Sequence, residues 1–241
     1  DGALYASPEV EEAAWALARR RLAGEPVAYL IGEWEFYGLP LDISESVLIP
    51  RPDTETLAEA AIGWLRQQEA PRVLDLCAGS GCLGLAIASQ VKDARVVLGE
   101  LSDGALRVCR QNIRRCGLTG RVTAMQLDAL RPPLQRLGDF DCIVSNPPYI
   151  PSGDIPGLDA SVRDYEPRIS TNTVTLNPAK TVGEVIRWPH LHLLPQERPD
   201  LHRRQGQRHR LHHHRRGFCV RFPALVPGGD QLPLRGGVCG P

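Results

Sequence analysis

Four consecutive residues with the sequence Asn-Pro-Pro-Tyr, Asn146 to Tyr149, present an amide side chain and an aromatic ring directly after an apolar run. The run over residues 141–145 is typical of a buried strand, and Pro147 and Pro148 end it and stiffen the backbone. The Asn146 carbonyl can accept a hydrogen bond from a substrate NH2 group, a proline carbonyl can accept another, and the ring of Tyr149 can stack on the substrate plane. Because Asn-Pro dipeptides also favour turns, these four residues alone leave two interpretations open, a turn and a site that captures a planar nitrogen.

A short turn with the sequence Ala-Gly-Ser-Gly, residues 78–81, is a second place where chemistry can be positioned. Its glycines let the backbone turn sharply and let a ligand approach without Cβ atoms in the way. Glu100 ends the next apolar run, 19 positions beyond Gly81, where a carboxylate can accept hydrogen bonds from both hydroxyls of a ribose. Asp128 ends the run after that and can accept a hydrogen bond from an adenine amine. For both acids the alternative is an ordinary solvated strand end.

The same turn excludes two common nucleotide sites. It lacks the third glycine of a dinucleotide fingerprint and the Gly-Lys-Ser/Thr of a P-loop. We therefore expect a nucleoside that needs no phosphate contacts. S-adenosylmethionine fits, with Asp75 and the turn backbone holding its amino-acid end. No metal is expected, because the seven cysteines form no Cys-x-x-Cys pair and the three adjacent histidines at 212–214 cannot all face one ion.

The fold class follows from an alternation of strand-like and helix-like patterns. These patterns predict elements over residues 72–76, 82–90, 95–99, 103–116, 122–127 and 140–145. Such alternation predicts right-handed βαβ units and an α/β fold, a Rossmann-like parallel sheet with helices on both faces. Ligands bind these sheets at the carboxyl ends of the strands, where the strand order reverses. We expect the first and fourth strands to be neighbours there, so that the turn after Asp75 faces Asn146.

The residues before the sheet predict a smaller unit. Apolar spacing indicates a helix over residues 8–23 and short strands or a hairpin over 27–49, linked by Gly38-Leu39-Pro40. Asp53 follows two prolines and suits the N-cap of the next helix. The chain opens on Asp1, so we expect a fragment or a processed form.

Composition separates an acidic part from a basic tail. Residues 171–241 carry 11 Lys and Arg against 4 Asp and Glu, whereas residues 1–170 carry 17 against 24. After about residue 168 no helical or strand period is sustained, and all seven histidines lie within residues 190–214, so we expect an irregular tail. The acidic part lacks the basic footprint of a nucleic-acid binder. No apolar run approaches the length of a membrane span, so no membrane segment is expected.

Several motifs resemble those of the release factor glutamine methyltransferases, which modify the Gln of the Gly-Gly-Gln motif in bacterial class 1 release factors. The resemblance runs from about Gly24 to Arg168. It rests on Gly24-Glu25-Pro26-Val27-Ala28-Tyr29-Leu30-Ile31-Gly32, Leu48-Ile49-Pro50-Arg51-Pro52-Asp53-Thr54-Glu55, Val73-Leu74-Asp75-Leu76 with its turn, Asn146-Pro147-Pro148-Tyr149-Ile150-Pro151, and Tyr165-Glu166-Pro167-Arg168. The Pro-Arg-Pro-Asp-Thr-Glu segment discriminates, because Asn-Pro-Pro-Tyr is shared with DNA adenine, rRNA guanine and ribosomal-protein glutamine methyltransferases.

This resemblance implies a class I S-adenosylmethionine-dependent methyltransferase fold and a set of site residues. Asn146, Pro147, Pro148 and Tyr149 would hold the substrate glutamine for direct methyl transfer to its side-chain nitrogen. Cofactor contacts would come from Asp75, Cys77, Ala78, Gly79, Ser80, Gly81, Glu100, Asp128, Ala129 and Asn146. Glu100 stands where the family more usually has Asp, and Ala129 stands where many members have a larger residue.

The resemblance also implies three regions and a partner. These regions are a truncated N-terminal substrate-recognition segment (residues 1–46), a methyltransferase core (47–168) and a divergent tail (169–241). The partner would be a class 1 peptide chain release factor, met in the cytoplasm by a monomeric enzyme without direct nucleic-acid, membrane or metal binding.

The tail shows none of the family's final strands. We therefore expect the sheet to be incomplete on its C-terminal side, with the fourth strand at an exposed edge. A reading-frame change, which the coding DNA would reveal, is our hypothesis for the tail. Two alternatives for the whole chain stay open: a DNA or rRNA amino-methyltransferase that uses the same four-residue site, and an inactive truncated or frameshifted product.

Overall fold

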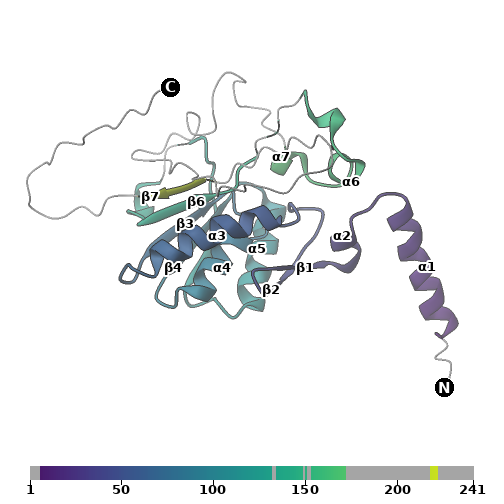
Figure 1. The fold of residues 1–241 in the computed structure, drawn as a ribbon, viewed down its shortest axis with the longest axis horizontal. Helices are drawn as coiled ribbons and strands as arrows, with labels where there is room; N and C mark the ends of the chain where they lie inside the picture. Colours follow the sequence, from purple (N-terminus) through teal and green to yellow (C-terminus); the bar gives the residue numbers. More distant parts are fainter. Residues whose placement is uncertain (1–5, 132–133, 149, 151–152, 172–217, 222–241) are drawn as a thin grey trace, which may run out of the picture.

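A computed structural model describes residues 6–131, 134–148, 150, 153–171 and 218–221. A central sheet is covered by helices, and an N-terminal helix lies apart from it (Figure 1). In chain order the elements are α1 Pro8–Leu22, α2 Val27–Ile31, β1 Glu33–Phe36, β2 Leu39–Asp42, α3 Pro52–Leu65, β3 Arg72–Leu76, α4 Cys82–Gln90, β4 Arg95–Glu100, α5 Asp103–Arg115, β5 Val122–Gln126, the 3-10 helix η1 Gln135–Leu137, β6 Cys142–Ser145, the 3-10 helix η2 Ile155–Gly157, α6 Ala160–Arg163, α7 Arg168–Thr171 and β7 Phe218–Arg221.

The main sheet has the strand order β5-β4-β3-β6-β7, and its first four strands are parallel. The chain runs outward from β3 to β5 and then returns to place β6 on the other side of β3. Leu76 of β3 pairs with Gly99 of β4 and with Ser145 of β6, so the carboxyl ends of these strands lie side by side. The α/β class and the neighbouring first and fourth predicted strands are therefore confirmed.

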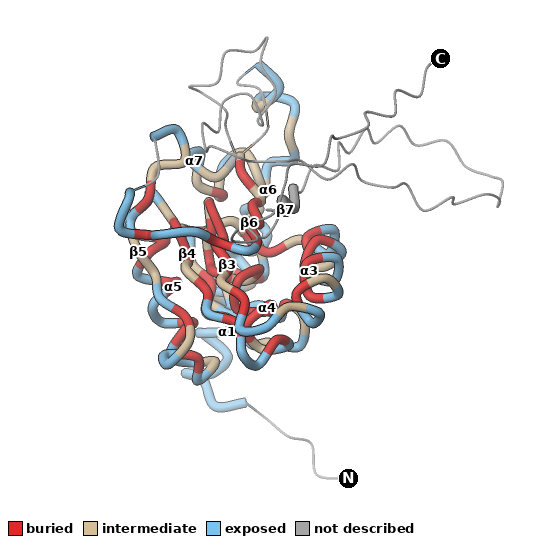
Figure 2. Tube along the Cα trace, turned by 90° about the vertical axis from the view of Figure 1, so that its left-hand side faces the viewer, coloured by how far each residue is buried: buried red, intermediate tan, exposed pale blue. Residues whose placement is uncertain are grey.

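Each face of the sheet has its own apolar cluster, because successive side chains of a strand point to opposite faces. On one face Val73, Leu98 and Val144 pack with the apolar sides of α3, α4 and α5. On the other face Leu74 and Ile143 pack with residues of the segment that contains η1. The burial of the central strands is shown in red in Figure 2. This double burial explains why the strands appear as nearly continuous apolar runs in the sequence.

Two predictions about residues 27–49 were wrong. Residues 27–31 form helix α2 rather than a strand, and Gly32 ends it in a left-handed conformation with φ 77°. The hairpin turn is Tyr37-Gly38, with φ 53° and 74°, so Leu39 and Pro40 already belong to β2. Two successive residues at positive φ are what a two-residue hairpin turn requires.

The predicted cap of α3 also lies elsewhere. The extended Arg51 is the N-cap and Pro52 begins the helix, as suits a proline with its fixed φ and missing N–H. Asp53 falls within the first turn, where its charge complements the helix dipole.

One segment of the tail corrects the expectation of a free sheet edge. Strand β7 pairs antiparallel with β6, from Cys142 opposite Arg221 to Ser145 opposite Phe218, so β6 has a neighbour on both sides. Residues 169–171 of the predicted irregular tail belong to helix α7, which corrects the expectation there. Residues 172–217 and 222–241, with every histidine, lie outside the described residues. Among the residues that are described, no helix combines the length and apolar character that a bilayer crossing requires.

Candidate functional site

The turn between β3 and α4 is held in an unusual backbone conformation. Cys77, Gly79 and Gly81, in residues 77–81 (hereafter the glycine turn), have φ values of 63°, 58° and 81°. A Cβ at Gly81 would lie 2.8 Å from the Leu98 side chain, whereas a Cβ at Gly79 would meet nothing within 4 Å. Gly81 is therefore needed for close packing against β4, and Gly79 faces open space.

Asp75 lies beneath the glycine turn and is 1% exposed. Its Oδ2 accepts a hydrogen bond from the Gly84 N–H at 2.9 Å, which fixes the first turn of α4 to β3. Burial raises the pKa of Asp75 to about 7, the Gly84 hydrogen bond opposes that rise, and the nearby negative charge of Glu100 adds to it. The Asp75 carboxyl group therefore holds the turn from below and is poised between its neutral and charged forms.

Glu100 is anchored by three main-chain donors at the end of β4. Its Oε2 accepts from the Gly79 N–H at 2.9 Å, and its Oε1 accepts from the N–H groups of Leu101 at 2.8 Å and Ser102 at 2.9 Å. A carboxylate offers about four acceptor positions, so one position stays open for a ribose hydroxyl. A second ribose hydroxyl would have to replace the Gly79 N–H.

The other residues of the turn contribute mainly backbone and packing. Ala78 is buried and its N–H donates to the Gly99 carbonyl at 3.1 Å. Burial raises the pKa of the Cys77 thiol to about 12, so this cysteine is a neutral, weakly polar part of the site wall. Ser80 is buried, and its carbonyl points away from the site toward α5.

The Asn-Pro-Pro-Tyr segment begins where β6 meets β3. The Ser145 hydroxyl donates to the Leu76 carbonyl at 2.6 Å and ties the two strand ends together. The Asn146 Nδ2 points to the hydroxyl of Thr54 in the first turn of α3, at 3.4 Å. Among the residues that the structure describes, no hydrogen bond to the Asn146 oxygen is found. Pro147 is buried and Pro148 half-buried, whereas Tyr149 lies outside the described residues.

Asp128 and Ala129 follow β5 at the same edge of the sheet. Asp128 Oδ1 accepts from the Leu130 N–H at 2.9 Å, and its Oδ2 pairs with Arg131 Nε at 3.2 Å. Ala129 packs against the apolar cluster that contains Leu76. Local bonds thus hold the Asp128 carboxylate at the strand end, in reach of the region that the glycine turn borders.

Motifs that precede β3 in the sequence contact the motif that follows β6. Arg51, which precedes α3, pairs with Glu166 at 2.5 Å, and the Glu166 carboxylate is buried. Burial raises the pKa of Glu166, and the charge of Arg51 opposes that rise. The Tyr29 hydroxyl donates to the Val47 carbonyl at 2.7 Å, and burial together with the charge of Glu166 raises its pKa.

A second contact joins the motif that begins at Gly24 to the motif that begins at Tyr165. The Tyr165 hydroxyl donates to the Ala23 carbonyl at 2.9 Å, and its ring lies 3.5 Å from the position of a Cβ at Gly24. The segments around residues 24, 51 and 166 are therefore joined into one support, which adjoins Asn146 through Thr54 of α3.

Three site residues were missed from the sequence: Thr54, Ser145 and Asn112. Thr54 was visible only as part of a helix start, and Ser145 only as the end of a strand. Asn112 gave a usable signal, because a polar residue on the apolar side of a predicted helix is unexpected; it is fully buried. Within the described ranges no group of three or more His, Cys, Asp or Glu side chains is placed to bind a metal ion.

The curated relatives of this chain include two of the same name. A release factor glutamine methyltransferase of Bradyrhizobium diazoefficiens is 45% identical over 159 residues, which are 64% of this chain and 52% of the relative. Another, of Bordetella pertussis, is 46% identical over 158 residues, which are 65% of this chain and 57% of the relative. The chain thus spans about half the length of these relatives. The resemblance inferred from the motifs is confirmed.

Solved structures are more distant. The human methyltransferase 10 domain containing protein is 18% identical, with a TM-score of 0.39, and the match covers 66% of this chain and 72% of that protein.

The family described as "Conserved hypothetical protein 95" matches residues 32–189. That match takes in the hairpin, the glycine turn and Asn146, and the chain belongs to this family.

Proposed function

We propose that the chain is a protein methyltransferase that uses S-adenosylmethionine to methylate the side-chain nitrogen of the glutamine in the Gly-Gly-Gln motif of a class 1 release factor. The observation that carries the proposal is the junction of β3 and β6. There the Ser145 hydroxyl bonds to the Leu76 carbonyl at 2.6 Å, so the glycine turn and Asn146 border one site. The names of the curated relatives supply the substrate.

The residues of the glycine turn would hold the cofactor. Its open side at Gly79 admits the ligand, and Glu100 would accept a hydrogen bond from the ribose. Asp128 would accept from the adenine amine beside Ala129. Asp75 would act from beneath, through the backbone of the turn that it fixes. Cys77, Ala78, Ser80 and Gly81 complete the cofactor wall in this proposal.

The Asn-Pro-Pro-Tyr segment would orient the substrate amide. Asn146 Oδ1 would accept one N–H of the glutamine, a carbonyl of Pro147 or Pro148 would accept the other, and Tyr149 would pack on the amide plane. Bound cofactor would supply the methyl group from its sulfonium. The methylated glutamine nitrogen, acidic once attacked, would release one proton to solvent after the transfer. No side-chain base is needed in this scheme, because orientation and exclusion of water lower the barrier.

The test uses the chain as it stands, with S-adenosylmethionine and a purified class 1 release factor. Transfer of one methyl group to the Gly-Gly-Gln glutamine, read by peptide mass, supports the proposal. Replacing Asn146 with alanine should abolish transfer and leave cofactor affinity within about twofold. A matched control is Gln67→Ala, an exposed amide in the turn after α3 whose Nε2 donates to the Gly63 carbonyl at 3.2 Å. Normal turnover by Asn146→Ala would refute the assigned role.

The finer parts of the proposal concern partners and regions. We infer a monomer that acts in the cytoplasm and makes no direct nucleic-acid contact, which the free thiols among the described cysteines and the acidic residues 1–170 support. We also infer a truncated substrate-recognition segment over residues 1–46, a methyltransferase core over 47–168 and a divergent tail over 169–241. Methyl transfer to DNA or rRNA in place of the release factor would overturn the substrate assignment.

A further inference from the structure

We propose that Asn112 of α5 is a positioning residue for the glycine turn, and that it fixes this turn and the β1–β2 hairpin in one arrangement. The functional half of this inference rests on the cofactor site proposed above. Asn112 touches neither substrate nor cofactor in that proposal, so it acts only through the backbone that it holds.

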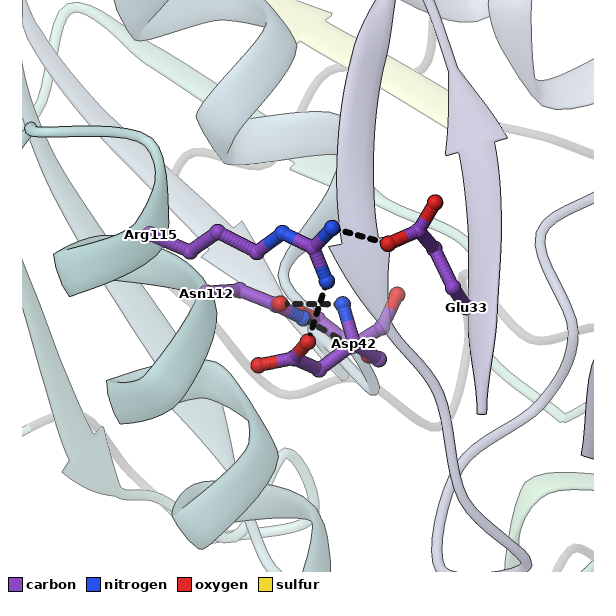
Figure 3. Close-up of polar contacts among 5 residues, drawn as sticks. Glu33, Asp42, Asn112 and Arg115 are labelled. Carbon is purple, nitrogen blue, oxygen red and sulfur yellow. Dashed lines mark hydrogen bonds and ion pairs between the residues drawn. The ribbon is translucent and has the colours of Figure 1, made fainter. Parts of the chain in front are cut away.

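The Asn112 side chain is fully buried and makes three hydrogen bonds. Its Oδ1 accepts from the Asp42 N–H at 2.7 Å, and its Nδ2 donates to the Asp42 carbonyl at 3.0 Å and to the Ser80 carbonyl at 2.9 Å. The pairing of Asn112 with Asp42 at the end of β2 is visible in Figure 3. One amide therefore bridges the hairpin and the glycine turn.

The chemistry of the three bonds requires an amide at position 112. Two of the partners are carbonyl oxygens, which need a donor, and the third is an N–H, which needs an acceptor. Among side chains of this size only Asn offers two donors and an acceptor together. Because the group is buried, any partner left unpaired keeps its full desolvation penalty.

A second residue of α5 holds the turn from the same side. The Cys109 thiol, one helical turn earlier, lies 3.1 Å from the Gly79 carbonyl. The carbonyls of Gly79 and Ser80 therefore both face α5, while the Gly79 N–H faces Glu100. Because Cys109 binds from this same side, α5 sets the orientation of the peptide units that border the cofactor.

Arg115 provides an internal control, because it joins α5 to the hairpin alone. It pairs with Glu33 of β1 and with Asp42 of β2 (Figure 3), and all three side chains are at least 31% exposed. Exposed ion pairs of this kind contribute little stability. Replacing Arg115 with glutamine loosens the hairpin contact and leaves the Ser80 bond in place.

The experiment compares Asn112→Asp with Arg115→Gln in the whole chain. The aspartate has the shape of asparagine but turns an acceptor toward two carbonyl oxygens. Hydrogen exchange is followed in peptides that cover residues 39–43 and 77–82, under conditions where urea titration shows each protein to be folded. Binding of S-adenosylmethionine is measured by calorimetry. Asn112→Ser, which keeps one donor, replaces the aspartate variant if that variant does not fold.

For Asn112→Asp we expect faster exchange in both peptides and cofactor binding weaker by at least about tenfold, the equivalent of losing one to two buried hydrogen bonds. For Arg115→Gln we expect faster exchange only in residues 39–43 and unchanged cofactor binding. Unchanged exchange of residues 77–82 in the Asn112 variant would overturn the inference. If the unsubstituted chain binds no cofactor, the proposed function fails for this chain, and the exchange result still decides the role of Asn112.

Discussion

Replacing Gly84 with alanine should destabilise the protein, although alanine is the better helix former. Gly84 lies in the first turn of α4, directly above Asp75 of β3. A Cβ at this position would lie 2.4 Å from Leu98 Cδ2 and 3.1 Å from both Cβ and Oδ2 of Asp75. Leu98 is itself fully buried in the layer between the sheet and α4, so its methyl group cannot move aside into solvent.

Two opposing terms set the size of the effect. Alanine in a helix interior is favoured over glycine by about 0.5–1 kcal/mol. Forcing an extra methyl group into a packed core costs about 1–3 kcal/mol. The middle of the two ranges leaves a loss of about 1 kcal/mol in the free energy of unfolding, which in a chain of this size lowers Tm by about 2–4 °C.

The chain offers a matched substitution with the opposite expected sign. Gly63 lies in α3, is exposed, and has no atom within 4 Å of its Cβ position. Gly63→Ala should therefore gain about 0.5–1 kcal/mol. Urea denaturation compares both variants with the unsubstituted chain. If the m-values are equal, a shift of the midpoint reports a change in stability alone.

The contrast between these two glycines decides the reasoning. If Gly84→Ala is as stable as Gly63→Ala, the close contact of α4 with β3 is not present in solution. Loss of stability in both variants would instead refute the use of helix propensity at these sites.

Two further predictions concern buried acids. Burial raises the pKa of Asp75 to about 7 in the folded chain, from 3.8 in the unfolded chain. The folded state therefore binds the Asp75 proton more tightly, and this stabilises it fully below about pH 4. The stabilisation is lost as the pH rises to about 7, which lowers the free energy of unfolding by at most about 4 kcal/mol. Asp75→Asn should flatten this part of the pH profile of unfolding, measured by urea titration between pH 4 and 8, and an unchanged slope would assign it to other groups. Arg51→Ala should cost about 3 kcal/mol, because it leaves the Glu166 carboxylate, with a side chain 1% exposed, without its cation. Adding Glu166→Gln should recover at least half of that loss, and no recovery would show that Arg51 acts by packing alone.

The central sheet was predictable because its strands are buried on both faces. In runs such as residues 72–76 and 95–100 most residues are apolar, and each run is followed by a helix. Because the first and fourth runs both end at residues with chemistry, Asp75 and Asn146, their adjacency followed from the reversal of strand order that such sheets require. The structure confirms that adjacency.

The peripheral elements could not be predicted in the same way. Residues 27–31 are apolar and short, and in such runs periodicity does not separate a strand from a helical turn. The hairpin turn contains Tyr37 at φ 53°, a conformation that few residues other than glycine adopt and that its sequence does not announce. The pairing of β7 with β6 joins segments more than 70 positions apart, and no local pattern in Phe218–Arg221 identifies its partner.

The site was only partly predictable for a related reason. Motifs identified Glu100 and Asn146, but the hydrogen-bond partner that orients Asn146 comes from a distant segment. Thr54, which orients the Asn146 amide, lies 92 positions away, and the Asn112 amide reaches over 70 positions to Asp42. Such partners share no spacing that a single sequence reveals.

The contacts between Arg51 and Glu166 and between Tyr165 and Ala23 also bear on how the chain folds. They close loops of 115 and 142 residues, which must be ordered before either bond can form. These contacts should therefore be absent from the rate-limiting transition state, and weakening them should accelerate unfolding while the refolding rate stays nearly constant. The support beside Asn146 would then be the last part of the described chain to assemble and the first to open.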